Sequence, residues 1–316
     1  MEVVALGELL IDFTSVSKDA GGYPTMTAHP GGAPANFLAA LAKFGAKTAL
    51  LGKVGQDAFG NLLVQTLKDA GIETKGIVMT DDVFTTLAFV TLDETGDREF
   101  SFARKPGADT CITFEELDLS LIDEAKVFHF GTLSLTNEPA RTATQKAVAY
   151  AKHQGKLITY DPNLRKPLWS DPEEAKRQLL WGLGQADVVK ISDEEVAFLF
   201  GLGVEEGAQH ILDTFGVRLV FVTCGANGCF FQNAIAKGHV PGLTNIKVAD
   251  TTGAGDIFGG SAVWKLLQYA KDPASLQQEE LLDIVEFACA SAGLSTTKSG
   301  GVSSVPNLDA VLEVLS

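Results

Sequence analysis

The sequence has only four cysteines among 316 residues, and none shares the spacing of a CxxC or Cys/His motif. The pattern argues against a disulfide framework or a zinc site and predicts reduced thiols in a cytoplasmic protein. The N-terminal residues lack the cationic start and apolar run of a signal peptide. Because no apolar run approaches the ~20 residues that a spanning helix needs, we expect a soluble protein without a membrane partner.

Positive charge is also scarce. The chain carries 25 Lys and Arg against 40 Asp and Glu, a formal net charge of −15, and it has no basic run. Such a balance argues against a nucleic-acid partner bound through a general electrostatic field. An anionic ligand would therefore need local backbone donors, a few placed cations or a metal.

Two common nucleotide-binding motifs are missing. No G-x-x-x-x-G-K-[ST] string occurs, and the first predicted strand runs into Gly7, Glu8 and Leu9 without forming G-x-G-x-x-G. These absences argue against a P-loop and against a dinucleotide enzyme. The five histidines match no recognisable motif with a Ser or Cys nucleophile, so we assign none of them a catalytic role.

The hydrophobic content of 46% suffices for a large core, and apolar strand patterns alternate with helical ones. This alternation predicts an α/β fold in a single domain, 1–316, with a mostly parallel sheet covered by helices on both faces. Strands are expected at residues 47–54, 76–79, 127–130, 156–160, 188–191, 219–223, 229–232 and 246–249. Helices are expected at residues 37–44, 59–69, 138–152, 172–183, 193–200, 279–296 and 308–315, and in the segment after Asp256.

One stretch departs from the α/β alternation. Residues 86–92 and 98–102 alternate in polarity and are joined by the turn-forming residues 93–97, which predicts a hairpin. Together with a polar, Gly-rich excursion that ends near Pro30, this hairpin is expected to form a small separate sheet or lid. The lid would comprise residues of about 12–30 and 84–104.

The stretch DTTGAGD at residues 250–256 carries the strongest chemical signal. Gly253, Ala254 and Gly255 open a predicted helix, where backbone N–H groups and the helix dipole favour an anion such as phosphate. Asp256 among these donors would repel a phosphate unless it had its own task, and we interpret that task as accepting a hydroxyl proton during phosphoryl transfer. The helix end should lower its proton affinity. The alternative is an ordinary turn and helix cap.

Further polar or Gly-rich segments follow the predicted strands, where open α/β sheets bind ligands. They contain Asp12, Gly31, Gly32, Asn36, Arg165, Lys190, Glu195, Thr223, Gly225 and Gly228. Turn formation, helix capping or surface coverage would explain any one of them alone. Glu195 would either hold Mg²⁺ through water or stabilise the dipole of its helix.

Two strings together resemble the signatures of the ribokinase-like (PfkB) sugar kinases: GGAPAN at residues 31–36 and DTTGAGD at residues 250–256. The order of elements agrees over nearly the whole chain. Four other strings are similar to fructokinases in particular. They are GELLIDF at 7–13, REFSFARKPGAD at 98–109, FHFGTLSL at 128–135 and DPNLR at 161–165.

The resemblance implies a Rossmann-like core with a β-sheet lid, ATP as phosphoryl donor, Mg²⁺ as its partner and Asp256 as general base. The backbone of Gly253, Ala254, Gly255 and Asp256 would form the anion hole. The implied sugar-binding residues are Asp12, Gly31, Gly32 and Asn36, with Arg104 from the lid and Arg165 near the transferred group. Lys190, Thr223, Gly225 and Gly228 would line the ATP site.

The resemblance also implies metal sites and an oligomer. Glu195 falls on the metal-linked Glu of the family's N-x-x-E motif, in which Ser192 replaces Asn. A K⁺ site would involve Asp250, Thr252, Ser295, Gly300 and Ser304. Lids of this family often pair, so a homodimer is expected.

These features favour a cytoplasmic enzyme that phosphorylates D-fructose to fructose 6-phosphate with ATP. Two alternatives stay open at this point. One is a kinase for another sugar or sugar acid, such as ribose or 2-keto-3-deoxygluconate, and the other is a catalytically inactive sugar-sensing protein of the same fold.

Overall fold

The computed structural model describes residues 1–92 and 98–316. In this part of the chain the main sheet has nine strands, in the order β13-β12-β11-β10-β9-β8-β1-β4-β5. The seven strands from β5 to β11 along this order are parallel, and β12 and β13 continue the sheet antiparallel. Their bounds are β1 Val3–Leu6, β4 Thr48–Gly55, β5 Ile77–Thr80, β8 Val127–Gly131, β9 Leu157–Asp161, β10 Val188–Ser192, β11 Leu219–Thr223, β12 Cys229–Asn233 and β13 Lys237–Val240.

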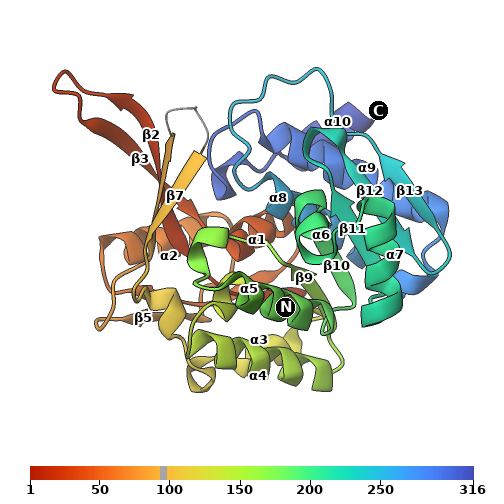
Figure 1. Ribbon diagram of the computed structural model, residues 1–316, viewed down its shortest axis with the longest axis horizontal. Helices are drawn as coiled ribbons and strands as arrows, with labels where there is room; N and C mark the ends of the chain where they lie inside the picture. Colours follow the sequence, from red (N-terminus) through yellow and green to blue (C-terminus); the bar gives the residue numbers. More distant parts are fainter. Residues whose placement is uncertain (93–97) are drawn as a thin grey trace.

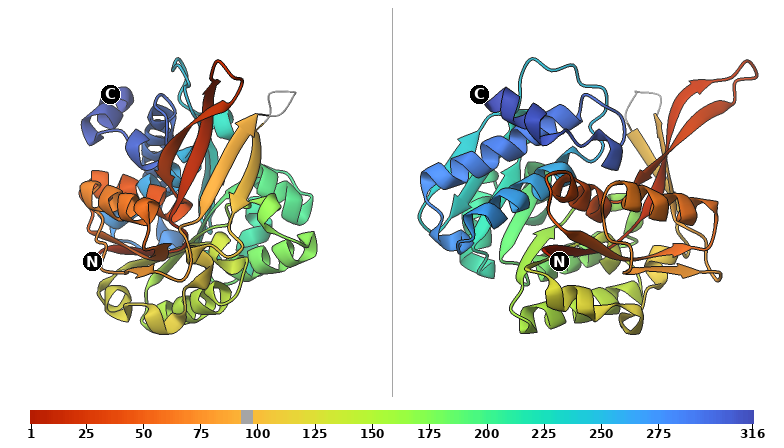
Figure 2. Two further views of the ribbon diagram at one scale, coloured as in Figure 1. Left: turned by 90° about the vertical axis from the view of Figure 1, so that its left-hand side faces the viewer. Right: turned by 180° about the vertical axis from the view of Figure 1, so that it is seen from behind.

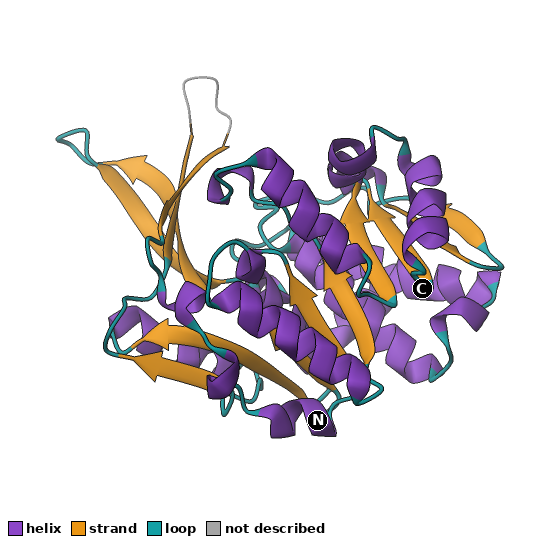
Figure 3. Ribbon diagram, turned by 60° about the horizontal axis from the view of Figure 1, so that its bottom comes forward, coloured by secondary structure: helices purple, strands orange, loops and turns teal. Residues whose placement is uncertain are grey.

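Helices cover both faces of the main sheet, as Figure 3 shows. Successive side chains of a strand point to opposite faces, so Val3 packs in one core and Val4 in the other. The first core contains α1 Ala33–Lys43, α2 Ala58–Asp69, α8 Ala254–Tyr269, α9 Gln278–Ser295 and α10 Leu308–Leu315. The second contains α3 Leu119–Glu124, α4 Ala140–His153, α5 Pro172–Leu183, α6 Asp193–Phe200 and α7 Val204–Phe215. None of these helices combines the length and apolar character needed to cross a membrane.

The order of the main sheet places a topological switch point beside β1. The chain passes from β1 to β4 and β5 on one side, and later from β8 to β9, β10 and β11 on the other. Loops at the carboxyl ends of the strands diverge at such a point and leave a crevice for a ligand. The site should therefore lie beyond the carboxyl ends of β1 and β8.

A second, smaller sheet contains four strands in the order β3-β2-β6-β7. Its strands are β2 Leu10–Lys18, β3 Pro24–Gly31, β6 Leu87–Leu92 and β7 Arg98–Ala103, so both segments expected to form the lid contribute to it. Figures 1 and 2 show the β2–β3 hairpin, in red, projecting from the α/β core. The predicted turn 93–97 lies outside the described residues.

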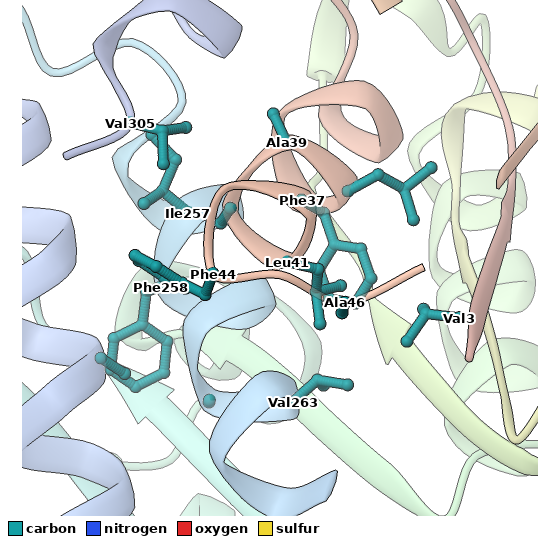
Figure 4. Packing of buried hydrophobic residues seen from close by; sticks show 14 of the residues in the cluster. Val3, Phe37, Ala39, Leu41, Phe44, Ala46, Ile257, Phe258, Val263 and Val305 are labelled. Atoms are coloured by element: carbon teal, nitrogen blue, oxygen red, sulfur yellow. The ribbon is translucent and has the colours of Figure 1, made fainter. Parts of the chain in front are cut away.

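Helix α1 packs closely against α8, and side chains such as Phe37 and Ile257 meet in their shared core (Figure 4). Gly32 adopts φ 116° just before α1, a conformation that favours glycine, and Pro34 stands in the first turn, where its missing N–H costs no helical hydrogen bond. A Cβ on Gly260 of α8 would lie 2.2 Å from the carbonyl oxygen of Phe37, so the glycine permits the close approach.

Most of the predicted elements are confirmed within one to four residues at their ends. The strand predicted at residues 246–249 is wrong: this segment has no ladder partner, and Ala249 instead donates to the carbonyl oxygen of Thr296 at 2.8 Å. Among the α-helices and strands of the described residues, α3, α7 and β13 were not predicted, and β2 and β3 were expected only as part of the small sheet.

Candidate active site

A cavity of about 550 Å³ lies where the carboxyl ends of the main strands, the start of α8 and the small sheet meet. The main fold contributes Glu8, Gly32, Ala33, Asn36, Leu133, Asn163, Arg165 and Lys190 to its wall. The small sheet contributes Leu10, Asp12, Thr14, Ser15, Val16, Val90 and Phe102. The remaining wall residues are Ala249, Asp250, Thr251, Thr252, Gly253, Gly255, Asp256 and Ser299. The cavity occupies the crevice expected from the switch point.

Asp256 lies in the first turn of α8 and lines this cavity, with 8% of its surface exposed. Each of its carboxylate oxygens accepts a hydrogen bond from a side-chain amide. Asn36 donates to Oδ2 at 2.9 Å, and Asn163 donates to Oδ1 at 3.1 Å. Two amides from distant parts of the chain thus hold the orientation of the carboxylate.

Burial raises the pKa of Asp256, while hydrogen bonds from Asn36 and Asn163 and the charges of Lys190 and Arg165 act to lower it. The expectation that the helix end lowers its proton affinity is therefore wrong in its net direction, because desolvation of the charged form outweighs the favourable contacts. A raised pKa makes the carboxylate a stronger base, which suits removal of a hydroxyl proton.

The glycine-rich start of α8 leaves free backbone donors beside Asp256. Gly253 has φ 77° and precedes the helix, and the N–H of Ala254 bonds to the carbonyl oxygen of Thr251 at 3.3 Å. Over the described residues, no hydrogen-bond acceptor meets the N–H of Gly255 or Asp256. Helix N-termini with unpaired donors favour anions. A Cβ on Gly255 would approach Nζ of Lys190 to 2.9 Å, so this cation lies beside the same donors.

Four of the six residues predicted to hold a sugar lie in the cavity wall: Asp12, Gly32, Asn36 and Arg165. Gly31 is buried just behind them, and a Cβ there would lie 2.3 Å from Oδ2 of Asp12. Its role is to leave room for that carboxylate. Burial raises the pKa of Asp12 to about 6, although the charge of Arg165 acts in the opposite direction.

Arg104, the sixth predicted sugar-binding residue, does not reach the cavity wall. It is 5% exposed, and its guanidinium pairs with Asp109 at 2.7 Å and donates to Thr136 and to the carbonyl oxygen of Leu133. These contacts tie the residue that follows β7 to the segment that contains Leu133 and Thr136. Its role toward a sugar stays a prediction.

Of the predicted nucleotide-site residues, only Lys190 lines the cavity. Its Nζ lies 3.0 Å from Oδ2 of Asp161. Burial acts to lower the pKa of Lys190, but Asp161, Glu195 and Asp256 outweigh it and raise the pKa, so the ammonium stays charged. Thr223 pairs with Ser192 at the ends of β11 and β10, and Gly225 and Gly228 form the turn that follows, with φ 54° and 93°.

Glu195 is buried, lies outside the cavity wall and forms a capping box with Ser192. Its Oε2 accepts from the N–H of Ser192 at 2.9 Å, and its Oε1 accepts from the N–H of Leu164 at 2.7 Å. The described residues hold no cluster of three or more His, Cys, Asp or Glu side chains in reach of one metal ion. The contact of Glu195 with Mg²⁺ through water stays a prediction.

The residues predicted to hold K⁺ come from the segment before α8, from the end of α9 and from the segment that follows α9. Oδ1 of Asp250 accepts from the N–H and hydroxyl of Thr252, and Oδ2 accepts from the N–H of Gly300 at 3.1 Å. Partial burial acts to raise the pKa of Asp250, but these hydrogen bonds lower it to about 2. Ser295 and Ser304 are buried nearby and donate to Ala292 and Gly301. Carboxylate, hydroxyl and carbonyl oxygens are ligands of the type that hard cations prefer.

Glu8 and Asn163 also line the cavity, although they were not among the predicted site residues. Glu8 accepts from the N–H of Ala33 at 2.8 Å at the start of α1, and burial raises its pKa to about 7. Asn163 contacts Asp256 directly. Both residues follow predicted strands, as do their neighbours Asp12 and Arg165. This position after a strand was the only sequence signal that indicated a role for Glu8 and Asn163.

The architecture and the site together define a class. A parallel sheet with helices on both faces, a small second sheet beside the carboxyl-end crevice and an Asp at the glycine-rich start of a helix characterise the ribokinase-like small-molecule kinases.

Comparison with known proteins identifies the family within that class. The family model described as pfkB family carbohydrate kinase matches residues 1–308. The chain is 42% identical to Fructokinase-1 of Zea mays and 41% identical to Fructokinase-2 of Solanum lycopersicum, over 99% of this chain and 97% and 95% of those proteins. The chain belongs to the pfkB family of carbohydrate kinases.

Solved structures agree with this assignment. A fructokinase from Xylella fastidiosa with bound ATP superposes with a TM-score of 0.91 at 31% identity, covering 99% of this chain and 98% of that one. A fructokinase from Vibrio cholerae O395, in a form that binds fructose, ADP and calcium ion, gives a TM-score of 0.88 at 34% identity, covering 100% and 99%.

Proposed function

We propose that this protein is an ATP-dependent fructokinase, which transfers the terminal phosphoryl group of ATP to D-fructose and forms fructose 6-phosphate. The observation that carries the proposal is the position of Asp256, whose carboxylate faces a polar cavity directly beside the unpaired N–H groups that open α8. The curated relatives of similar length described as fructokinases favour fructose as the sugar.

The chemistry follows from these groups. A sugar hydroxyl close to Asp256 gives its proton to the carboxylate while its oxygen bonds to phosphorus, and the bond from phosphorus to ADP breaks. The N–H groups of Gly255 and Asp256, with the ammonium of Lys190, stabilise the negative charge on the phosphoryl oxygens. Asp12 and Asn36 hold the sugar hydroxyls, and Arg165 neutralises charge near the transferred group.

Cations complete the proposed reaction. Structures of related fructokinases contain ATP, or ADP with potassium or calcium ion. Glu195 would contact a Mg²⁺ ion through water, and that ion, bound with ATP, would neutralise phosphate charge. The oxygen-rich loops around Asp250 and Gly300 fit K⁺ beside the anion hole.

The four cysteines are all free, which accords with the reducing cytoplasm that we propose as its location. We also propose that the small sheet acts as a lid, because residues such as Thr14 and Phe102 on it line the same cavity as Asp256. Closing a lid excludes water from the reacting groups.

A kinase assay that couples ADP release to NADH oxidation, run over fructose, ribose and 2-keto-3-deoxygluconate, tests the proposal. We expect the highest kcat/KM with fructose. A higher value with either other substrate would reassign the enzyme within the family, and no ADP release with any sugar would support the inactive sugar-sensing alternative.

A further inference from the structure

Asn163 stands in an unusual backbone conformation at the floor of the cavity. Its φ is 45°, in the left-handed region that Asn tolerates better than most residues with a side chain. The residue is 9% exposed and lines the cavity, and its Nδ2 donates to Oδ1 of Asp256 at 3.1 Å.

The backbone on both sides of Asn163 is anchored. Its own N–H donates to Oδ1 of Asp161 at 3.1 Å, and the other oxygen of Asp161 accepts from Lys190 at 3.0 Å. The next N–H, that of Leu164, donates to Glu195 at 2.7 Å. Two buried acids thus fix the peptide groups around Asn163. The direction of the Asn163 side-chain amide is therefore set by the residues at the ends of β9 and β10.

We propose that Asn163 is a positioning residue for the proton transfer, because its amide holds Oδ1 of Asp256 while Asn36 holds Oδ2, and the two amides together aim the carboxylate at the sugar hydroxyl. This role rests on the proposed function of Asp256 as general base. Each carboxylate oxygen has a further lone pair, so the two amides leave acceptor capacity for the substrate.

The ionised form of Asp256 depends on a balance of nearby charges. Lys190 on β10 and Arg165 after β9 favour it, whereas the carboxylates Asp12 on β2 and Asp161 on β9 oppose it, as does burial. A hydrogen bond donated to the charged form lowers the pKa of an acid. Removal of the Asn163 amide should therefore raise the pKa of Asp256 further.

The left-handed backbone by itself accounts for an Asn or a Gly at this position but not for the contact with Asp256. Asn163→Gly separates the two explanations, since glycine adopts φ 45° without strain and lacks the amide. Asn163→Asp keeps the size of the side chain and the tolerance for left-handed backbone. It replaces the amide donor by a carboxyl group next to the carboxylate of Asp256.

The experiment measures pH profiles of kcat and kcat/KM for fructose, at saturating ATP and Mg²⁺, in the full-length protein and both variants. For Asn163→Gly we expect kcat at neutral pH to fall about 10- to 100-fold, the range for a lost hydrogen bond to a charged group. The acid limb of the profile should move to higher pH, and further in Asn163→Asp, while KM changes little. Thermal unfolding of both variants should stay close to that of the parent.

Two results would overturn the positioning role. One is an acid limb in Asn163→Gly that coincides with that of the parent; the other is a uniform loss of activity at every pH together with a lowered unfolding temperature. The activity of the unsubstituted protein separates a failure of this proposal from a failure of the proposed function. If the unsubstituted protein phosphorylates fructose, the proposed function holds whatever the variants show. If it is inactive toward all sugars, the proposed function itself is refuted.

Discussion

Asp256 combines two properties that oppose each other. Burial favours the protonated acid, yet a general base must be ionised before it can accept a proton. The amides of Asn36 and Asn163 and the cations Lys190 and Arg165 counter the cost of burial without removing it. The balance leaves the pKa of Asp256 above its ordinary value, so its carboxylate is a stronger base than that of an exposed Asp toward a hydroxyl that is bonding to phosphorus.

A second cavity acid, Asp12, should control sugar binding as pH changes. Burial raises its pKa to about 6, so it is ionised above that pH and protonated below it. A protonated Asp12 loses acceptor capacity for sugar hydroxyls. We expect KM for fructose to rise about tenfold per pH unit below about 6 if only the ionised form binds. In Asp12→Asn, KM should be high and independent of pH; a parent KM that is constant between pH 5 and 7 would contradict this assignment.

At the scale of elements, the contact between α1 and α8 matters because α1 carries Asn36 to the carboxylate of Asp256 on α8. Two neighbouring glycines of α8 face α1 differently. A Cβ on Gly260 would lie 2.2 Å from the carbonyl oxygen of Phe37, whereas a Cβ on Gly259 would lie 3.5 Å from its ring, an ordinary contact.

These glycines provide a matched pair of substitutions. Gly260→Ala should lower the free energy of unfolding by about 1–3 kcal/mol, since α1 must move to accommodate the methyl group. Gly259→Ala should leave it unchanged or raise it by about 0.5–1 kcal/mol through the better helix propensity of Ala. Urea unfolding measures both. Equal effects of the two substitutions would show that close α1–α8 contact is not what requires glycine.

The start of α6 offers another test. Ser192 accepts from the N–H of Glu195 at 3.2 Å and so caps the helix at the position where relatives with the N-x-x-E motif have Asn. Since Ser and Asn are similarly good N-caps, Ser192→Asn should change stability little, while Ser192→Ala should cost about 1 kcal/mol. A large loss in Ser192→Asn, measured by urea unfolding, would mean that Ser192 has another role.

Local patterns predicted most of these elements, and the exceptions have physical causes. Alternating apolar residues at 246–249 indicated a strand, but a local pattern does not show whether a partner strand lies alongside. Helix α7 was missed because Gly207 interrupts its pattern; the glycine is needed there, since a Cβ would lie 2.2 Å from Val196.

At the scale of the whole molecule, the site brings together residues that are distant in the sequence. Asn36 is 220 positions from Asp256, and Asn163 is 93 positions away. The two sequence signatures indicated Asn36 and Asp256 separately, but spacing along the chain carries no information on which amide meets which oxygen. The Asn163 contact could therefore be found only from the assembled sheet.

The small sheet should also govern assembly. Its β2–β3 hairpin projects from the core (Figure 1), and Val16 and Tyr23 on it are 60% and 73% exposed. Pairing of two such sheets would cover these side chains, so we expect light scattering to give twice the 33.5 kDa mass of the chain. A monomeric mass at micromolar protein concentration would refute the predicted homodimer.

The central claim is that Asp256 removes the proton from the sugar hydroxyl during phosphoryl transfer. Asp256→Asn keeps the size of the side chain and removes its basicity, and general-base catalysis contributes about 10²- to 10⁴-fold. The most direct measurement is single-turnover phosphorylation of fructose by this variant, with sugar and ATP binding followed by calorimetry. We predict unchanged folding, binding constants close to those of the parent, and a rate lowered by that factor. A variant that binds both substrates and transfers the phosphoryl group at the parent rate would contradict the account.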